Sequence, residues 1–453
     1  MKKYESYKET SIPNLVKELP IHWKSCKMNY LVEVKDGTHD SPSYVDESAY
    51  TYPLVTSKDL VSGNLDFYKC KFIKEEDHFN IIKRSDVSKG DILMPMIGSV
   101  GSPVIVKTNR EFSIKNVALF KTSNNEEINT SYLNYLLSSD FIERQFDLNS
   151  NGGVQNFVSL SVLRKLNIFS LPLKEQTKIA NYLDHKTTII DALIDKKEQL
   201  IKKLQAQRQA IINELVCKGL DKNAKMKNSG IEWFGEIPEH WKVVKLKYIS
   251  DVSFSSVDRH QYKDELKVNI CHYPDAYKND KILPETKLSE GTCTFSEYEK
   301  YQLKKGQVII TKDSESADDI GVPTFVTQTF QNTVCGYHLA ILSTYENQLK
   351  GEYLFRFLQT DIVKSFFETN ANGVTRFGLG KPTIENLYVP KLEIEEQNKI
   401  VYQINLKADK IDSTIIQVKT VIQKLKSYRQ SIISEAVTGK IDLRDWQISE
   451  KKV

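Results

Sequence analysis

Two stretches of the chain place apolar residues three or four positions apart, which is the spacing of one helix face. The first, from about 174 to 217, lies between Pro172 and Gly219 and contains no proline or glycine. The second lies between Pro390 and Gly439. Proline before a helix and glycine after it are typical of helix ends. Each stretch therefore predicts one helix of about 44 residues, roughly 65 Å long. The seam positions are Ile190, Leu193, Ile194, Leu200, Ile201, Leu204, Ile211 and Leu215 in the first helix, and Ile411, Ile415, Val418, Ile422, Leu425, Arg429 and Ile432 in the second.

The chain sequence repeats once, with offsets between 216 and 221 residues. One copy is too long for a solenoid repeat, so we interpret the chain as two fused versions of one module, related by an approximate two-fold axis. That symmetry would pair the two long helices in antiparallel orientation; the alternative is that each is an ordinary core helix of its own domain. The matching segments are residues 18–24 with 236–242, Lys89-Gly90 with Lys305-Gly306, 151–157 with 372–377, Glu175-Gln176 with Glu396-Gln397, and 208–214 with 429–435.

The regions before the two helices, from about 25 to 165 and 243 to 385, follow no helical period for long. Short apolar runs separated by polar turns predict strands there. One helix is predicted after the strands of each copy, at 130–145 and 351–368. Each region therefore predicts an α/β domain with many polar loops, where recognition residues usually lie. The sequences of these two regions differ from each other far more than the sequences of the two long helices do. This suggests two recognition domains with different targets. The strand-like runs include 91–94, 102–106, 117–120 and 307–310.

The composition of the 453 residues, with 40% hydrophobic and 27% charged, is that of a globular protein. A net charge of +4, from 63 basic and 59 acidic residues, excludes a histone-like coating of DNA by bulk positive charge. Local basic patches could still bind nucleic acid. The six cysteines form no CxxC pair, and no apolar run approaches the roughly 20 residues that span a bilayer. We expect reduced thiols and a cytoplasmic protein without a signal peptide.

Catalytic motifs are scarce in the sequence. It contains no phosphate-binding GxxxxGK[ST] loop, no HExxH, and no NPPY-type segment of the kind that amino-methyltransferases use. One spacing resembles a nuclease site: Asp275, Glu285 and Lys287 could hold Mg²⁺ and activate water. Chance matches of this kind are expected in a chain rich in acidic and basic residues. His39 and His338 each stand without a clear carboxylate or nucleophile partner.

Three segments carry a resemblance to a known family. They are residues 229–241 (SGIEWFGEIPEHW), 372–379 (NGVTRFGL) and 389–397 (VPKLEIEEQ). With their duplicated arrangement, the chain resembles the specificity subunit of type I restriction-modification systems over nearly its whole length. The first copy departs from the pattern at residues 11–14 and 171–176.

The resemblance implies an α/β fold with two target recognition domains joined by two long antiparallel coiled-coil helices. Each domain would read one half of a split double-stranded DNA site. Two modification subunits would carry S-adenosylmethionine, and two restriction subunits would carry ATP and Mg²⁺. This chain would hold no catalytic centre, no cofactor and no metal, and would contact no membrane. The implied division is recognition domain 1 at 1–165, spacer helix at 166–222, recognition domain 2 at 223–385, spacer helix at 386–441 and tail at 442–453.

Polar loop residues are the candidates for DNA contact. Asn and Gln side chains favour adenine, Arg favours guanine, and Lys and Arg bind phosphates. The candidates are Thr38, His39, Ser57, Lys58, Asn116, Gln155 and Asn156 in the first copy, and Lys312, Asp313, Ser314, Tyr337, His338, Thr375 and Arg376 in the second.

Overall fold

The computed structural model describes residues 2–12, 14–61, 63–98, 100–149 and 157–448. The chain divides into two compact units. Unit 1 consists of residues 1–197 and 419–453, and unit 2 of residues 198–418. Each unit thus includes half of each long helix, whereas the predicted division separates the helices from the recognition domains.

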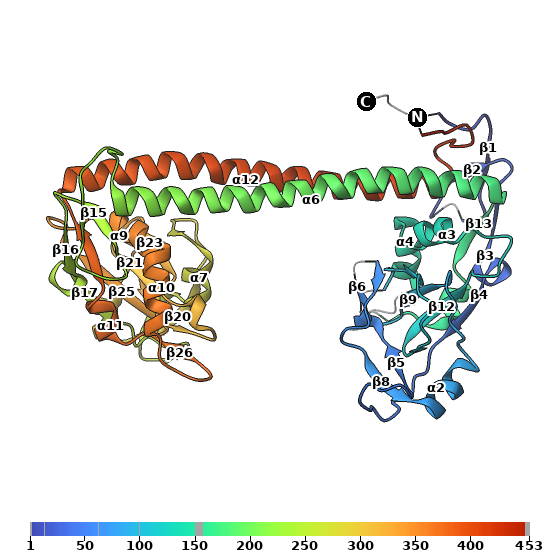
Figure 1. The fold of residues 1–453 in the computed structure, drawn as a ribbon, viewed down its shortest axis with the longest axis horizontal. Coiled ribbons are helices and arrows are strands. Elements are labelled where there is room, and N and C mark those ends of the chain that lie inside the picture. Colours follow the sequence, from blue (N-terminus) through green and yellow to red (C-terminus); the bar gives the residue numbers. More distant parts are fainter. Residues whose placement is uncertain (1, 13, 62, 99, 150–156, 449–453) are drawn as a thin grey trace. The chain divides into compact units, whose positions relative to one another are not determined.

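The two long helices are α6 (Leu173–Lys218) and α12 (Ile394–Val437). In unit 1, Arg429 Nε on α12 lies 2.9 Å from Asp191 Oδ1 on α6. In unit 2, Arg208 Nε on α6 lies 3.1 Å from Asp412 Oδ2 on α12. The contacts occur in opposite order along the two helices, so the helices are antiparallel (Figure 1). Arg208 matches Arg429 and Asp191 matches Asp412 in the repeat, so one ion pair is present twice.

The predicted seam is largely buried. Eight of its residues are less than one-tenth exposed: Ile190, Ile194, Leu215, Ile411, Ile415, Val418, Ile422 and Ile432. Leu193 and Leu200, however, are 42% and 38% exposed. They lie beside the contact line, where a 3.5-residue repeat drifts away from a 3.6-residue helix. The alternative of two separate core helices is therefore wrong.

Unit 1 packs two small sheets on each other. The strand order of the first is β10-β9-β12-β4, and that of the second is β11-β5-β8. Val55, Leu93, Ile114 and Leu119 belong to the buried core of this unit. The strands are β4 (Glu33–Asp36), β5 (Thr51–Val55), β8 (Lys71–Lys74), β9 (Ile92–Pro95), β10 (Val104–Ile105), β11 (Ser113–Ile114) and β12 (Val117–Lys121); β3 (Lys24–Lys27) and β13 (Asn167–Ser170) form a separate pair.

Unit 2 repeats this arrangement with longer strands (Figure 1). Its first sheet has the order β17-β25-β21-β23-β19, and its second has the order β20-β18-β24. The parallel pair β18·β24 corresponds to β5·β11 of unit 1. The strands are β17 (Ser250–Phe254), β18 (Leu266–Cys271), β19 (Lys281–Ile282), β20 (Ser289–Cys293), β21 (Val308–Thr311), β23 (Pro323–Val326), β24 (Thr333–Cys335) and β25 (Leu339–Thr344).

The single helix predicted after the strands of each copy is wrong, because two helices stand there. Unit 1 has α3 (Thr130–Leu137) and α4 (Asp140–Asn149); unit 2 has α9 (Gly351–Leu358) and α10 (Asp361–Asn370). The Thr360 hydroxyl accepts a hydrogen bond from the Val363 amide, which caps the start of α10. In unit 1, the Ser139 hydroxyl donates to the Leu136 carbonyl at the end of α3. Local hydroxyl bonds therefore divide the helix in both copies.

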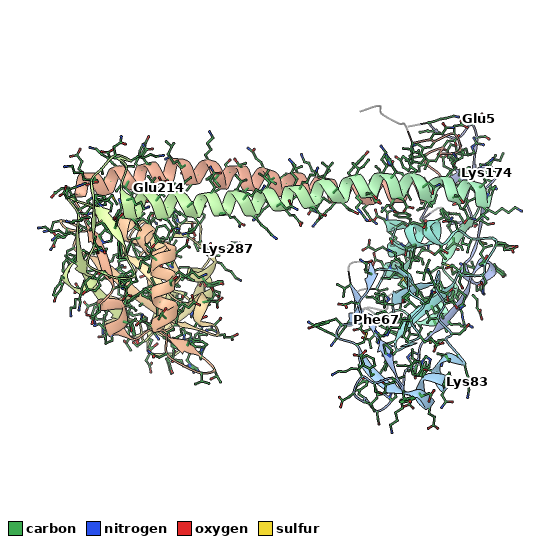
Figure 2. All side chains as sticks on the ribbon, in the orientation of Figure 1. Glu5, Phe67, Lys83, Lys174, Glu214 and Lys287 are labelled. Carbon is green, nitrogen blue, oxygen red and sulfur yellow. The ribbon has the colours of Figure 1, made fainter. Side chains whose placement is uncertain are left out.

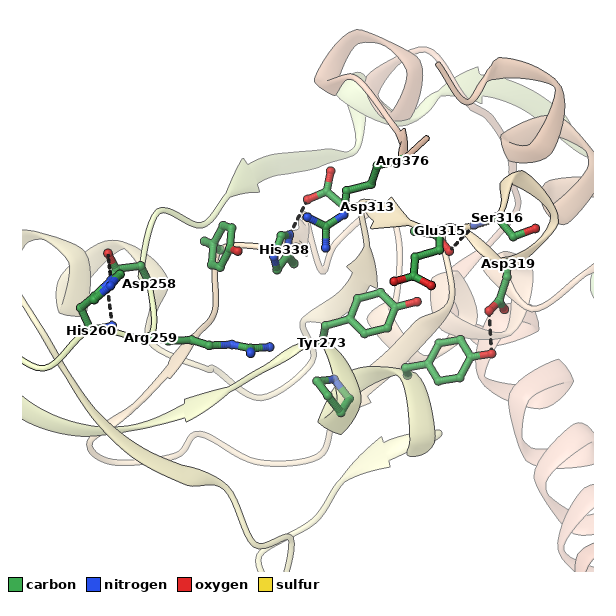
Figure 3. Close-up of a pocket in the computed structure, with 14 residues that line it drawn as sticks. Asp258, Arg259, His260, Tyr273, Asp313, Glu315, Ser316, Asp319, His338 and Arg376 are labelled. Atoms are coloured by element: carbon green, nitrogen blue, oxygen red, sulfur yellow. Dashed lines mark hydrogen bonds and ion pairs between the residues drawn. The ribbon is translucent and has the colours of Figure 1, made fainter. Parts of the chain in front are cut away.

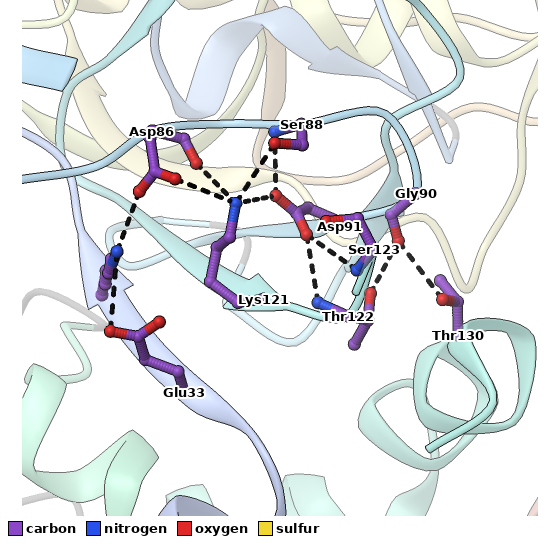
Figure 4. A network of polar contacts seen from close by, with 10 residues as sticks. Glu33, Asp86, Ser88, Gly90, Asp91, Lys121, Thr122, Ser123 and Thr130 are labelled. Carbon is purple, nitrogen blue, oxygen red and sulfur yellow. Dashed lines mark hydrogen bonds and ion pairs between the residues drawn. The ribbon is translucent and has the colours of Figure 1, made fainter. Parts of the chain in front are cut away.

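The repeated Lys-Gly pair marks the turn before the central strand of each unit. Gly90 and Gly306 both have positive φ, at 96° and 86°, a region that favours glycine. The fully buried Asp91 follows Gly90, accepts hydrogen bonds from the Thr122 and Ser123 amides, and lies 2.8 Å from Lys121 Nζ (Figure 4). This polar network fixes the turn to the end of β12.

The buried imidazole of His78 should make the stability of unit 1 depend on pH. Its ring stacks on Tyr52 at 3.8 Å, Nδ1 lies 2.9 Å from Ser113 Oγ, and Nε2 has no partner among the described residues. Burial lowers the pKa of His78 below its usual 6.5, so the unfolded chain binds the proton more readily. Unit 1 should lose stability as the pH falls below about 6.5. Thermal unfolding at pH 8 and 5.5 tests this: His78→Gln should narrow the difference between the two melting temperatures, and an unchanged difference would contradict the assignment.

Within the described residues, none of the helices is long and apolar enough to cross a membrane.

Candidate nucleic-acid interface

In unit 1, three loops that carry candidate residues leave the same edge of the fold. Strands β5 and β11 are parallel, with Val55 opposite Ile114, so their carboxyl ends meet. Thr38, which follows β4, bridges Lys115 in parallel. Ligands of open α/β sheets usually bind at such an edge. The structure therefore brings together the loops that hold Thr38 and His39, Ser57 and Lys58, and Asn116.

His39 is held between two polar side chains. Its Nε2 lies 3.0 Å from Asp36 Oδ2, and its Nδ1 lies 2.8 Å from Asn116 Oδ1. Asp36 is buried and also accepts a hydrogen bond from Arg84. The prediction that His39 has no carboxylate partner is therefore wrong. The side chain of His39 remains 51% exposed, so its ring is positioned and still accessible.

Gln155 and Asn156 lie outside the described residues. The next residue, Phe157, bridges Ile97 just beyond β9. In unit 2 the matching loop is closed by β22 (Asp313–Ser314), which pairs with β26 (Phe377–Gly378). Thr375 and Arg376 immediately precede β26, and both are exposed. Phe157 and its match in the repeat, Phe377, thus each pair with a residue just beyond the central strand of their unit.

The equivalent edge of unit 2 forms a cavity of about 870 Å³. Strands β18 and β24 are parallel and end together at Cys271 and Cys335. Helix α7 (Tyr273–Lys278) follows β18, and Tyr337 and His338 follow β24. Predicted and unpredicted residues both line the cavity (Figure 3). The predicted ones are Asp313, Ser314, Tyr337, His338 and Arg376.

Asp313 organises one wall of this cavity. Its Oδ2 lies 2.8 Å from His338 Nδ1 and 2.8 Å from Lys312 Nζ. Burial opposes ionisation of the carboxyl, but the hydrogen bonds from Lys312 and His338 outweigh it and lower the pKa of Asp313. The group is therefore an anion that orients both neighbours. The prediction that His338 has no carboxylate partner is also wrong.

Comparison with known proteins finds that the chain is similar to one family. Residues 20–204 match the family model described as the type I restriction modification DNA specificity domain. The chain is 24% identical over 460 residues to the putative type I restriction enzyme MjaX specificity subunit of Methanocaldococcus jannaschii, covering 98% of both chains. It is 22% identical to the MjaVIII specificity subunit of the same organism, covering 94% of this chain and 95% of the relative. The chain is therefore similar over nearly its whole length to specificity subunits of type I restriction-modification systems.

The fold of this chain also agrees with that of a solved structure. A chain from a structure described for complex assembly and conformational transition of the type I R-M system superposes with a TM-score of 0.69. The two chains are 15% identical, and the match covers 93% of this chain and 99% of the other. The similarity supports the fold, with its two α/β units and two long helices.

Several residues around the two sites were missed by sequence reasoning. They are Asp36 and Arg84 in unit 1, and Arg259, Tyr273, Tyr277, Glu315 and Asp319 in unit 2. The repeat itself holds a signal for Tyr273, because the candidate Ser57 shifted by 216 residues falls on it. The structure supports that equivalence: Asp59 bonds the Thr56 amide in unit 1 as Asp275 bonds the His272 amide in unit 2.

The nuclease alternative has no support in the part of the chain that the structure describes. Asp275 Oδ2 accepts a hydrogen bond from the His272 amide at 2.9 Å, so it caps α7. The described residues contain no group of three His, Cys, Asp or Glu side chains that could hold a metal ion. Among these residues, nothing supports the metal site that the spacing of Asp275, Glu285 and Lys287 suggested.

Loss of the Asp275 cap should destabilise unit 2 and should remove no catalytic activity. Asp275→Ala should lower its free energy of unfolding by about 1 kcal/mol, as measured by urea denaturation, because one helix cap is lost. Asp59→Ala is the matched control in unit 1 and should behave alike. A metal-dependent cutting activity that disappears in Asp275→Ala would contradict the capping assignment.

Proposed function

We propose that this chain is a type I specificity subunit and reads a DNA site of two specified blocks, one block through each unit. One observation carries the proposal: the same edge of both units presents different hydrogen-bonding side chains. Unit 1 offers His39 and Asn116, whereas unit 2 offers Asp313 and His338. Equivalent edges with different donors and acceptors suit two readers of different sequences. Nearby lysines and arginines would bind phosphates, and that part of the affinity should fall with salt.

The long helices would act as the spacer between the two blocks. Half-sites one duplex turn apart lie about 34–36 Å from centre to centre. The 46 residues of α6 measure about 69 Å at 1.5 Å per residue, which is long enough to span that separation. Bases between the blocks would then need no contact from this chain.

The helices would also bind the modification subunits. Side chains project outward along both helices (Figure 2), and among them Tyr402 and Leu406, four residues apart on one face of α12, are 64% and 57% exposed. Exposed apolar side chains on one helix surface favour a partner there. We propose two modification subunits with S-adenosylmethionine and two restriction subunits with ATP and Mg²⁺. This chain would contribute recognition and no catalytic centre, in the cytoplasm beside the host DNA.

Co-expression in a host that lacks type I systems tests this role. The chain and its modification subunit would be expressed separately and together, and methylated bases mapped by long-read sequencing. Methylation of a split motif should arise only when both are present, and the two should co-purify. Methylation of the same motif by the modification subunit alone, or by this chain alone, would overturn the proposal.

A further inference from the structure

The cavity of unit 2 has two aromatic walls. Tyr273 and Tyr277 of α7 stack with ring centroids 5.5 Å apart and planes 13° from parallel. Tyr337 packs on His338 with centroids 3.6 Å apart. Flat aromatic surfaces of this kind stack nucleobases without regard to sequence.

Three charged side chains in the cavity have no polar partner within the described part of the chain. Arg259, Glu315 and Arg376 line it, and none has a hydrogen bond or ion pair within the described part of the chain. The other carboxylates are engaged: Asp319 with Tyr277, Asp258 with His260. In Figure 3, Arg259 extends toward Tyr273, and Glu315 lies near the same ring. An unpaired carboxylate beside an aromatic face suits an amino group as ligand, and an arginine suits a phosphate.

This surface combines side chains that can read base edges with a hollow between them. Side chains that read base edges in a duplex protrude into a groove. A hollow of about 870 Å³ can also receive a group that has left the duplex. Its volume falls within the range of roughly 300–1,000 Å³ that is usual for small-molecule sites. A nucleobase that has swung out of the helix has suitable size, flatness and polarity.

We propose that this cavity binds one extruded nucleobase with an exocyclic amino group, cytosine or adenine, from the DNA block that unit 2 reads. The inference rests on the proposed function. Tyr273 stacks on the base, Glu315 accepts a hydrogen bond from its amino group, and Arg259 and Arg376 lie beside the flanking phosphates.

The first copy lacks the aromatic walls. Ser57 stands where unit 2 has Tyr273, and the residue before Asn116 is Lys115, where the residue before His338 is Tyr337. The equivalence of Asn116 and His338 follows from matching bonds, Met96 N to Asn116 O and Lys312 N to His338 O. Extrusion should therefore be confined to one of the two blocks.

Mismatch scanning of the DNA tests the proposal. The full chain, bound to its modification subunits, is mixed with a series of duplexes that contain the methylation site. In each duplex one base is left unchanged, and the base opposite it is replaced by a mismatched one. A mismatched base costs less free energy to extrude. The duplex with the mismatch at one position of the unit 2 block should therefore bind about ten-fold more tightly. A mismatch at a methylated position can also tighten binding. Variants of the cavity are therefore needed to identify the position whose base enters the cavity. Tyr273→Ser and the exposed Glu315→Gln should abolish the gain at the cavity position alone, whereas Tyr248→Ser, at a tyrosine outside the cavity, should leave every gain intact.

The outcomes separate this inference from the proposed function. If the matched duplex outcompetes unrelated DNA but no mismatch gain responds to Tyr273→Ser or Glu315→Gln, the cavity proposal is overturned and the reader role stands. If no duplex is preferred, both fail. A free nucleotide is the other source of the same chemistry. Stabilisation of the DNA-free complex by deoxycytidine or deoxyadenosine monophosphate, lost in Tyr273→Ser and without any mismatch gain, would overturn extrusion.

Discussion

Glu175→Ala is expected to lower the free energy of unfolding of unit 1 by about 3–5 kcal/mol, because several donors would lose one buried acceptor. Glu175 opens α6, and its carboxylate accepts hydrogen bonds from Tyr4 Oη at 2.5 Å and Trp23 Nε1 at 3.0 Å. Its second oxygen lies 2.8 Å from His22 Nε2. Trp23 is fully buried, and burial together with the Glu175 contact raises the pKa of Tyr4, so both groups remain donors.

Glu396→Ala is the matched variant in unit 2. Glu396 holds Trp241 Nε1 at 3.1 Å and contacts His240, whose side chain is 61% exposed. Water can replace the histidine contact, so the cost should be only about 1–2 kcal/mol. Hydrogen exchange of amides in β4 and β12 would report unit 1, and of amides in β17 and β25 unit 2. Equal losses in the two variants would contradict this assignment of the repeated His-Trp and Glu-Gln segments.

Asp313→Asn is expected to reduce the preference for the cognate block of unit 2 by about 10- to 100-fold, the range for loss of one good base contact. The carboxylate orients both His338 and Lys312. Without its charge the Lys312 ammonium is released, so non-specific affinity for DNA should rise slightly. The specificity ratio therefore falls more than the affinity does. Competition binding of cognate and unrelated duplexes at fixed salt measures that ratio.

Asp258→Asn removes the same charge from the same cavity and serves as the control for Asp313→Asn. Asp258 contacts His260 and does not touch His338 or Lys312. Its loss should change non-specific affinity in the same direction and leave the cognate preference within about two-fold. If both variants change the cognate preference by the same factor, Asp313 acts only through its charge. The positioning of His338 would then have no part in recognition of the DNA sequence.

The long helices and the duplication could be predicted from the sequence because both depend on local signals. Helical periodicity and repeated segments such as His240-Trp241 need no knowledge of distant contacts. The partners of the histidines could not be predicted in this way. Asn116 meets His39 across 77 residues, and Asp313 meets His338 across 25, only because particular strands pair in particular registers.

The cavity of unit 2 could not be predicted from the sequence either. It forms where parallel strands β18 and β24 end together and β22 pairs with β26, and each of these pairings joins distant segments. The division of the predicted helix at Thr360 could have been foreseen, because a threonine before an aspartate is a common helix start.

An exchange of one unit's strands and loops tests most directly the claim that each unit reads its own block. Residues 249–384 of unit 2 would be replaced by the matching segment of a relative with a different methylation motif, and long-read sequencing would map the methylated bases. The account predicts a motif in which one block changes to that of the relative while the other block and the spacer length stay the same. A change in both blocks, or an unchanged motif from the exchanged chain, would contradict it.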